Sequence, residues 1–196
     1  MKKIITTFVA ILLLSGCTTL KMEVAKEQNL PILAADKSRV VFMRSAGHGT
    51  VQDAGLYSVQ DGNITFKGVI KNSTKMFLDV EPGKHTFMSN GFAARFIEAN
   101  LSPGKTYYVI VAPRGWPGIF FALLPVSNDS EINLNSKSFK KMKSKTTLVE
   151  IGPKAIEWAE GQKELAQKNY EHEWPAWNSK PESAKSKHTI KREFGE

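Results

Sequence analysis

Short runs of alternating hydrophobic and polar residues fill the middle of the chain. Residues 64–67 alternate strictly and residues 76–81 alternate apart from Phe77, whereas residues 39–44, 107–112 and 119–126 contain several apolar residues in succession. Strict alternation is typical of a strand with one buried and one solvated face, and a continuous apolar run is typical of a strand covered on both sides. The pattern therefore predicts about eight short strands, of which the three continuous runs are central.

Turn residues separate these strands. The Asp-Gly pair at 61–62 is a strong hairpin signal. The Pro-Gly pairs at 82–83 and 103–104 each suit a type II turn, because proline presets φ near about −65° and glycine accepts a positive φ. A phosphate-binding loop is the alternative for these Pro-Gly-Lys repeats, but the helix amino terminus that such a loop uses is not indicated. The spacing predicts an antiparallel sandwich or barrel over residues 38–126.

An apolar run opens the chain. Residues 1–3 carry two lysines, and residues 4–14 are apolar except for two threonines. A helix of this length would span roughly 16 Å at about 1.5 Å per residue, which is about half of the hydrocarbon thickness of a bilayer. The run therefore predicts a signal peptide rather than a membrane span.

A cysteine follows this run in the sequence Leu14-Ser15-Gly16-Cys17. The ending resembles the lipobox of bacterial lipoproteins, in which an apolar and two small residues precede a cysteine that is lipidated before cleavage. The resemblance implies cleavage between Gly16 and Cys17, and a diacylglycerol and an N-acyl chain such as palmitate on Cys17. Three acyl chains at about 0.8 kcal/mol per buried CH₂ would hold the protein on a membrane. The alternative is an incidental cysteine in an ordinary secretory signal.

The residue after the cysteine bears on the destination. Thr18 stands where some lipoproteins have aspartate. In sorted lipoproteins this pattern resembles export to the outer membrane, so we expect the protein on that membrane, facing the periplasm. Nucleic acid is not an expected partner, because this compartment excludes it.

Lysines cluster after the predicted strands, and a helical pattern follows them. The five lysines are Lys137, Lys140, Lys141, Lys143 and Lys145. Each lysine near an anionic membrane surface can contribute about 1 kcal/mol, so we expect a contact with anionic lipid, with a solvated loop as the alternative. Residues 153–170 place apolar side chains at helical spacing, and we expect Trp158 to dock on the sandwich. Beyond Trp177 the apolar content predicts no folded structure.

Counting chain reversals predicts which loops share an end of the domain. If every connection reverses the chain, the tight turns lie at one end, which we expect to face the membrane, and the longer connections lie at the far end. That far rim carries His48, Arg114 and Trp116. Loops on a rigid scaffold often carry binding residues. We therefore predict a ligand rim, in which Trp116 stacks on a sugar and Arg114 holds an anion; the alternative is a Trp116 that plugs the sandwich.

Composition and motifs exclude several classes of site. The chain has 196 residues, 41% hydrophobic, a net charge of +8 and one cysteine, which excludes an internal disulfide and a multi-cysteine zinc site. Its four histidines lack metal-ligand spacing, and no serine lies in a nucleophile-elbow pattern. We therefore predict no catalytic residue, no metal and no cofactor besides the lipid on Cys17.

The segments 39–42, 80–85 and 101–109, with their paired Pro-Gly-Lys turns and a Thr-Tyr-Tyr strand, resemble a bacterial family. They are similar to the lipoproteins of the domain of unknown function 2846. The resemblance covers roughly residues 38–126 and implies a transthyretin-like or carboxypeptidase-regulatory-like β-sandwich of about seven to eight strands. It implies no activity and no catalytic residue.

Together these patterns divide the chain into successive parts. The predicted parts are a signal peptide at 1–16, a lipidated cysteine and tether at 17–37, the sandwich at 38–126, a basic connection at 127–152, a helix at 153–172 and a disordered tail at 173–196. We expect a non-catalytic binding or scaffolding module for an envelope protein or glycan. The alternatives are a structural subunit of an envelope-spanning secretion-type machine, by fold analogy, and an envelope hydrolase.

Overall fold

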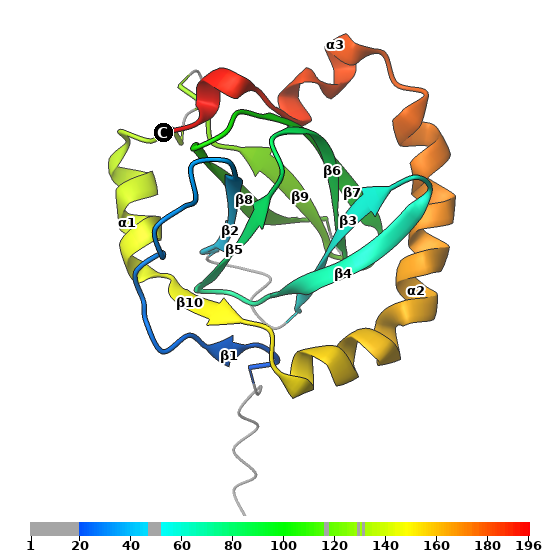
Figure 1. Cartoon of the computed structure of the whole chain (residues 1–196). Coiled ribbons are helices and arrows are strands. Elements are labelled where there is room, and N and C mark those ends of the chain that lie inside the picture. The colour runs from blue at the N-terminus through cyan, green and yellow to red at the C-terminus, as the bar shows by residue number, and fades with distance from the viewer. Residues whose placement is uncertain (1–19, 47–51, 116–117, 129, 131) are drawn as a thin grey trace, which may run out of the picture.

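Two β-sheets stack face to face in the computed structural model, which describes residues 20–46, 52–115, 118–128, 130 and 132–196 (Figure 1). The first sheet has the strand order β1 (Glu23–Val24), β10 (Thr147–Glu150), β5 (Thr74–Val80), β2 (Ser38–Arg44), β8 (Thr106–Arg114) and β9 (Phe120–Pro125). The second sheet has the order β11 (Thr189–Ile190), β7 (Ala94–Leu101), β6 (Gly83–Asn90), β3 (Ala54–Gln60) and β4 (Asn63–Ile70). The helices are α1 (Lys137–Lys145), α2 (Pro153–Asn178), α3 (Glu182–Lys185) and the short 3₁₀ turns η1 (Ser186–His188) and η2 (Arg192–Phe194).

The eight strands that the alternation predicted are β2 to β9, and the prediction of a mainly β, sandwich-like fold is confirmed. Side chains of both sheets fill the space between them. Phe42 of β2 meets Phe87 of β6 edge to face, with ring centroids 5.4 Å apart. All of β2 is buried, as its continuous apolar run predicted, because α1 covers the face of the strand that points away from the second sheet.

The expectation of purely antiparallel sheets is wrong. β2 pairs with β8 in parallel, with Arg39 opposite Thr106, and the β10–β5 and β11–β7 pairs are also parallel. The reversal count itself gives β2 and β8 the same direction. Alternation and turns do not determine which strands are neighbours in the sheet. Here the chain leaves β2 for β3 and β4 of the second sheet, returns to place β5 beside β2, forms β6 and β7, and returns again to place β8 on the other side of β2.

The tight turns gather at one end of the sandwich, as the reversal count predicted. Gly104 donates its backbone N–H to the carbonyl of Lys37 at 2.7 Å, and Ser38 donates its hydroxyl to the carbonyl of Ser102 at 2.7 Å. The turn at 102–104 therefore lies beside the start of β2, and so does the turn at 81–83, because Lys37 also pairs with Glu81. Gly104 has φ +69°, which agrees with the type II turn that Pro-Gly predicts.

Residues 20–37, which we expected to be a tether, pack on the body. Met22 is 3% exposed, and its sulfur lies 3.3 Å from the backbone nitrogen of Val69. The Gln28 amide bonds both the N–H and the carbonyl of Leu148 in β10, at 2.8 and 3.2 Å. The segment then crosses the outer face of the first sheet, where Arg39 reaches the carbonyl of Pro31. A few residues with buried contacts hold this mostly polar segment on the body. The average composition of the segment does not reveal such single residues.

The predicted basic connection at 127–152 contains a helix and a strand. Ser136 caps α1 by accepting a hydrogen bond from the Phe139 N–H at 3.2 Å. Phe139 and Met142, three residues apart, point into the sheet and leave the lysines at the surface. This spacing predicts one buried face, but the high lysine content concealed it.

Helix α2 lies across the outer face of the second sheet, and the expected docking of Trp158 is confirmed. Trp158 is 6.3 Å from Phe66 between ring centroids, and Tyr170 and Trp177 contact Phe96 at 6.3 and 5.8 Å. In Figure 1 the helix runs along one side of the sandwich, from the β1 and β10 region toward α3. The helix extends to Asn178, beyond the predicted end at 172.

The tail at 173–196, which we expected to be disordered, is folded against the sheets. Ile190 is 1% exposed, and β11 adds to the edge of β7. Lys185 is 6% exposed and bonds Glu98 at 3.0 Å. Glu196 exchanges two backbone hydrogen bonds with Thr106. Isolated anchor residues hold this segment, so its low overall apolar content was misleading.

Candidate functional site

A groove of about 650 Å³ lies over the outer face of the first sheet, between α1 and residues 28–30. We call it the α1 groove. Its lining residues are Gln28, Asn29, Leu30, Val41, Met43, Lys75, Tyr108, Lys140, Lys143, Ser144, Lys145, Thr146 and Thr147. Four of them are lysines, and none is acidic. The charged residues among those that line the groove are therefore all basic, and the floor beneath them is apolar.

The floor comes from strands whose outward faces are apolar. Val41 and Met43 alternate along β2, and Tyr108 lies beside them on β8. Phe139 of α1 packs edge to face on Tyr108, with ring centroids 5.0 Å apart. The packing of α1 thus sets one wall of the groove.

A polar network closes one side of the groove. The Tyr108 hydroxyl donates to the Glu196 carboxylate at 2.6 Å, and Lys143 Nζ lies 3.1 Å from the same carboxylate oxygen. The Lys143 ammonium also lies 4.8 Å from the centre of the Tyr108 ring, which is a cation–π distance. Lys75 donates from Nζ to the backbone carbonyl of Lys143 at 2.9 Å. These contacts hold two lysines in defined positions before any ligand binds.

The environment shifts the pKa values of this network. Burial and the neighbouring charge of Lys143 lower the pKa of the Lys75 ammonium. Burial alone would raise the pKa of the Glu196 carboxyl, but its hydrogen bonds with Tyr108 and Lys143 lower it overall. Burial alone would lower the pKa of the Lys143 ammonium, but its contacts with Tyr108 and Glu196 outweigh this effect and raise it overall.

The predicted basic residues separate into two groups. Lys140, Lys143 and Lys145 line the α1 groove, whereas Lys137 and Lys141 are exposed on α1 and do not line it. Lys143 and Lys145 lie in the last turn of the helix, where the helix dipole favours positive charge. Contact of this helix with anionic lipid stays a prediction.

The predicted ligand rim is described only at Arg114. This side chain is exposed and donates to the carbonyl of its neighbour Pro113 at 3.0 Å. His48 and Trp116 lie outside the described residues. At the same end, Phe92 is 70% exposed and lies against Gly118. Sugar binding at this rim stays a prediction.

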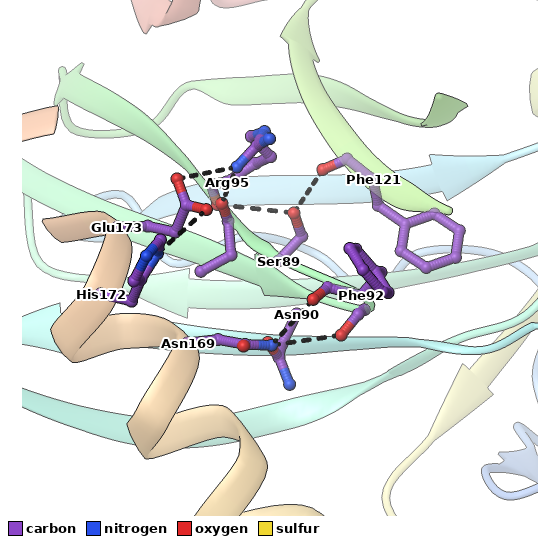
Figure 2. A network of polar contacts seen from close by, with 10 residues as sticks. Ser89, Asn90, Phe92, Arg95, Phe121, Asn169, His172 and Glu173 are labelled. Carbon is purple, nitrogen blue, oxygen red and sulfur yellow. Dashed lines mark hydrogen bonds and ion pairs between the residues drawn. The ribbon is translucent and has the colours of Figure 1, made fainter. Parts of the chain in front are cut away.

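Polar contacts near the same end fasten α2 to the second sheet (Figure 2). Asn169 donates to the side chain of Asn90 at 2.8 Å and to the carbonyl of Gly91 at 3.3 Å. Arg95 pairs with Glu173 at 3.1 Å, and its guanidinium stacks on Phe120 at 4.2 Å. Each polar group is satisfied by a partner on the neighbouring element, so we assign this network to holding the helix in place.

A second groove, of about 930 Å³, lies near the tight turns. Its ionisable lining residues are Asp61, Glu81, Lys84, His85, Glu98 and Glu182. Four of these six residues are acidic, and of these Glu81 already pairs with Lys37 and Glu98 with Lys185. Across the described ranges, no group of three His, Cys, Asp or Glu side chains is placed to hold a metal.

Sequence reasoning missed Lys75, Tyr108 and Glu196. Lys75 immediately precedes the alternating residues of β5, so the alternation predicts that its side chain points away from the core. The contribution of Glu196 was not readable, because it depends on the fold of the last residues against β8.

The start of the chain matches a model of a lipid attachment site. Residues 1–18 match the model described as the prokaryotic membrane lipoprotein lipid attachment site. The chain is a lipid-anchored protein of the bacterial envelope. Cys17 lies within the match and outside the described residues. In the part of the chain with described structure, no helix is long and apolar enough to cross a membrane.

No curated protein matches the chain. Membership of the domain of unknown function 2846 lipoproteins therefore stays a prediction that rests on the Pro-Gly-Lys turns.

Proposed function

We propose that this lipoprotein is a non-catalytic binding module of the cell envelope and that the α1 groove is its binding site. The observation that supports the proposal is a lining of four lysines over an apolar floor, in which Glu196 at the edge pairs with Lys143 and leaves Lys75, Lys140 and Lys145 without a carboxylate partner among the described residues. Such a lining suits a partner segment that presents a carboxylate next to apolar side chains. Thr18 supports the outer membrane, facing the periplasm, as the location.

The groove favours a protein partner over a neutral sugar. Exposed lysines attract an anion over several ångströms, and each exposed ion pair contributes roughly 0.2–1 kcal/mol. The floor of Val41, Met43 and Tyr108 would exclude water from apolar groups that approach the lysines. Affinity should therefore fall with ionic strength but not vanish, because the apolar contribution is not screened.

The fluorescent anion 8-anilinonaphthalene-1-sulfonate tests this site, since it joins a sulfonate to aromatic rings. The body from residue 20 onward, free of lipid, should bind one molecule with enhanced fluorescence. Lys140→Gln should weaken the binding about two- to fivefold, which corresponds to one exposed ion pair. Lys154→Gln, an exposed lysine on α2, is the matched control and should change nothing. Equal affinity in both variants would refute the assignment of the groove.

A further inference from the structure

The chain packs on the folded body from Leu20 onward, only three residues after the lipid attachment site at Cys17. Leu20 packs against the main hydrophobic core, and Met22, two residues later, is almost completely buried. Only three peptide units separate Cys17 from Leu20, and they span at most about 11 Å when fully extended. The membrane surface that holds the acyl chains therefore lies close to the part of the body around Leu20. This conclusion rests on lipid attachment and not on the α1 groove.

Three large aliphatic side chains are exposed in this part of the body. Val24 is 55% exposed, Ile151 is 45% exposed and Ile156 is 49% exposed. We call these three residues the anchor face. Few exposed large hydrophobic residues occur elsewhere in the described chain, and they include Ile32 and Phe92.

Local contacts bring the anchor face together. Val24 of β1 pairs with Val149 of β10, two positions before Ile151. The side chain of Glu23 lies against Gly152, in the space that a Cβ at this position would occupy. Ile156 donates its N–H to the carbonyl of the same glycine at 3.3 Å. Figure 1 shows β1, β10 and the start of α2 on one side of the molecule.

The charges around the anchor face are mixed. Lys21 and Lys154 lie in the same stretches of chain as Glu23 and Glu150. The face therefore has no strong preference for anionic lipid. Its contact with a membrane would depend on apolar side chains at the depth of the headgroups and upper acyl chains.

We propose that the anchor face rests on the bilayer surface and that lipidated Cys17 holds it there. The short link restricts the body to a small range of orientations, and the exposed aliphatic side chains select the one that buries them. The end with the tight turns was expected to face the membrane. Instead, the segment 20–37 carries the chain from the anchor face to that end, where Gly104 meets Lys37. The proposed contact is thus on the side of the sandwich where β1 and β10 lie.

Spin labels on the full lipidated protein in phosphatidylcholine vesicles test this orientation. Cys17 is the only cysteine and is acylated, so Val24→Cys and Ile156→Cys each provide one labelling site. Ile32→Cys, at a residue that is 99% exposed, is the control for a water-facing position. Ile151→Cys replaces either variant that does not fold. Collision of each nitroxide with oxygen reports lipid, and collision with a water-soluble nickel chelate reports water.

The proposal expects the labels at 24 and 156 to collide mainly with oxygen and the label at 32 mainly with the nickel chelate. Equal access of the nickel chelate to all three labels would overturn it. A second copy of the chain could also cover the anchor face. In that case the labels at 24 and 156 would show spin–spin broadening that disappears on dilution with unlabelled protein, and this result would overturn the proposal as well.

Discussion

Removal of one buried aromatic ring should detach α1 and destroy the α1 groove. Phe139 of α1 is 2% exposed and packs edge to face on Tyr108 of the first sheet. The change Phe139→Ala removes that contact and leaves a cavity. Lys141→Ala, on the exposed face of the same helix, is the matched control.

The magnitude follows from the burial of the ring and from the length of the helix. A fully buried phenylalanine replaced by alanine costs about 3–5 kcal/mol. Helix α1 has nine residues, fewer than the roughly 12–15 that an isolated helix needs to be even marginally stable in water. The helix should therefore unfold locally once its docking free energy is lost. A loss of about 3 kcal/mol corresponds to roughly a 100-fold larger population of the open state.

Hydrogen exchange followed by mass spectrometry measures this opening directly. In Phe139→Ala, the amides of residues 137–145 should exchange about 100-fold faster than in the wild type, or as fast as in an unfolded peptide. The amides of β6 and β7 should exchange at their wild-type rates. Lys141→Ala should exchange like the wild type. If protection of α1 is unchanged in Phe139→Ala, the ring does not hold the helix, and our account of the groove wall is wrong.

Three further predictions concern pH, lipid and sugar. The folded protein lowers the pKa of Glu196 from 4.5, so the contacts of its carboxylate should stabilise the fold fully above about pH 4.5. This stabilisation should be lost as the pH falls through the lowered pKa. Chemical denaturation at several pH values should show that Glu196→Gln removes this part of the pH dependence. The unlipidated body should bind phosphatidylglycerol vesicles in a salt-dependent manner, and glutamine at all five predicted lipid-contact lysines should weaken this binding. Unchanged binding would refute the predicted contact with anionic lipid. The lysines are Lys137, Lys140, Lys141, Lys143 and Lys145. If the predicted rim binds glycans, Trp116→Ala should abolish retention on immobilised peptidoglycan fragments, and unchanged retention would remove this residue from any binding role.

The local features of the fold were accessible from the sequence because they depend on near neighbours in the chain. The alternation at 64–67 placed β4, and the Pro-Gly pair at 103–104 placed a turn whose glycine has φ +69°. The start of the chain indicated a lipid anchor, which the family match supports. Each of these signals is contained in fewer than about twenty residues.

The remaining features depend on contacts between distant segments. β8 lies beside β2 and not beside β7 because of the way the side chains of both sheets pack in one core. The pattern of hydrophobic and polar residues in β8 would be the same beside either strand. The last residues resemble a disordered tail in composition, yet Lys185 meets Glu98 and Glu196 meets Thr106, about ninety positions away. The lining of the α1 groove comes from residues 28–30, β2, β5, β8 and α1, so no local sequence motif predicts it.

The most direct test of the proposed binding site is an octanoate titration of the lipid-free body followed by amide NMR. Octanoate carries one carboxylate on an apolar chain and therefore matches the lining of the α1 groove. The account predicts saturable shifts at Lys75, Tyr108 and Lys143, with the amides around the mixed-charge groove at 58–61 unmoved. Shifts confined to residues 58–61 and 81–86, or no saturable shift at all, would contradict it.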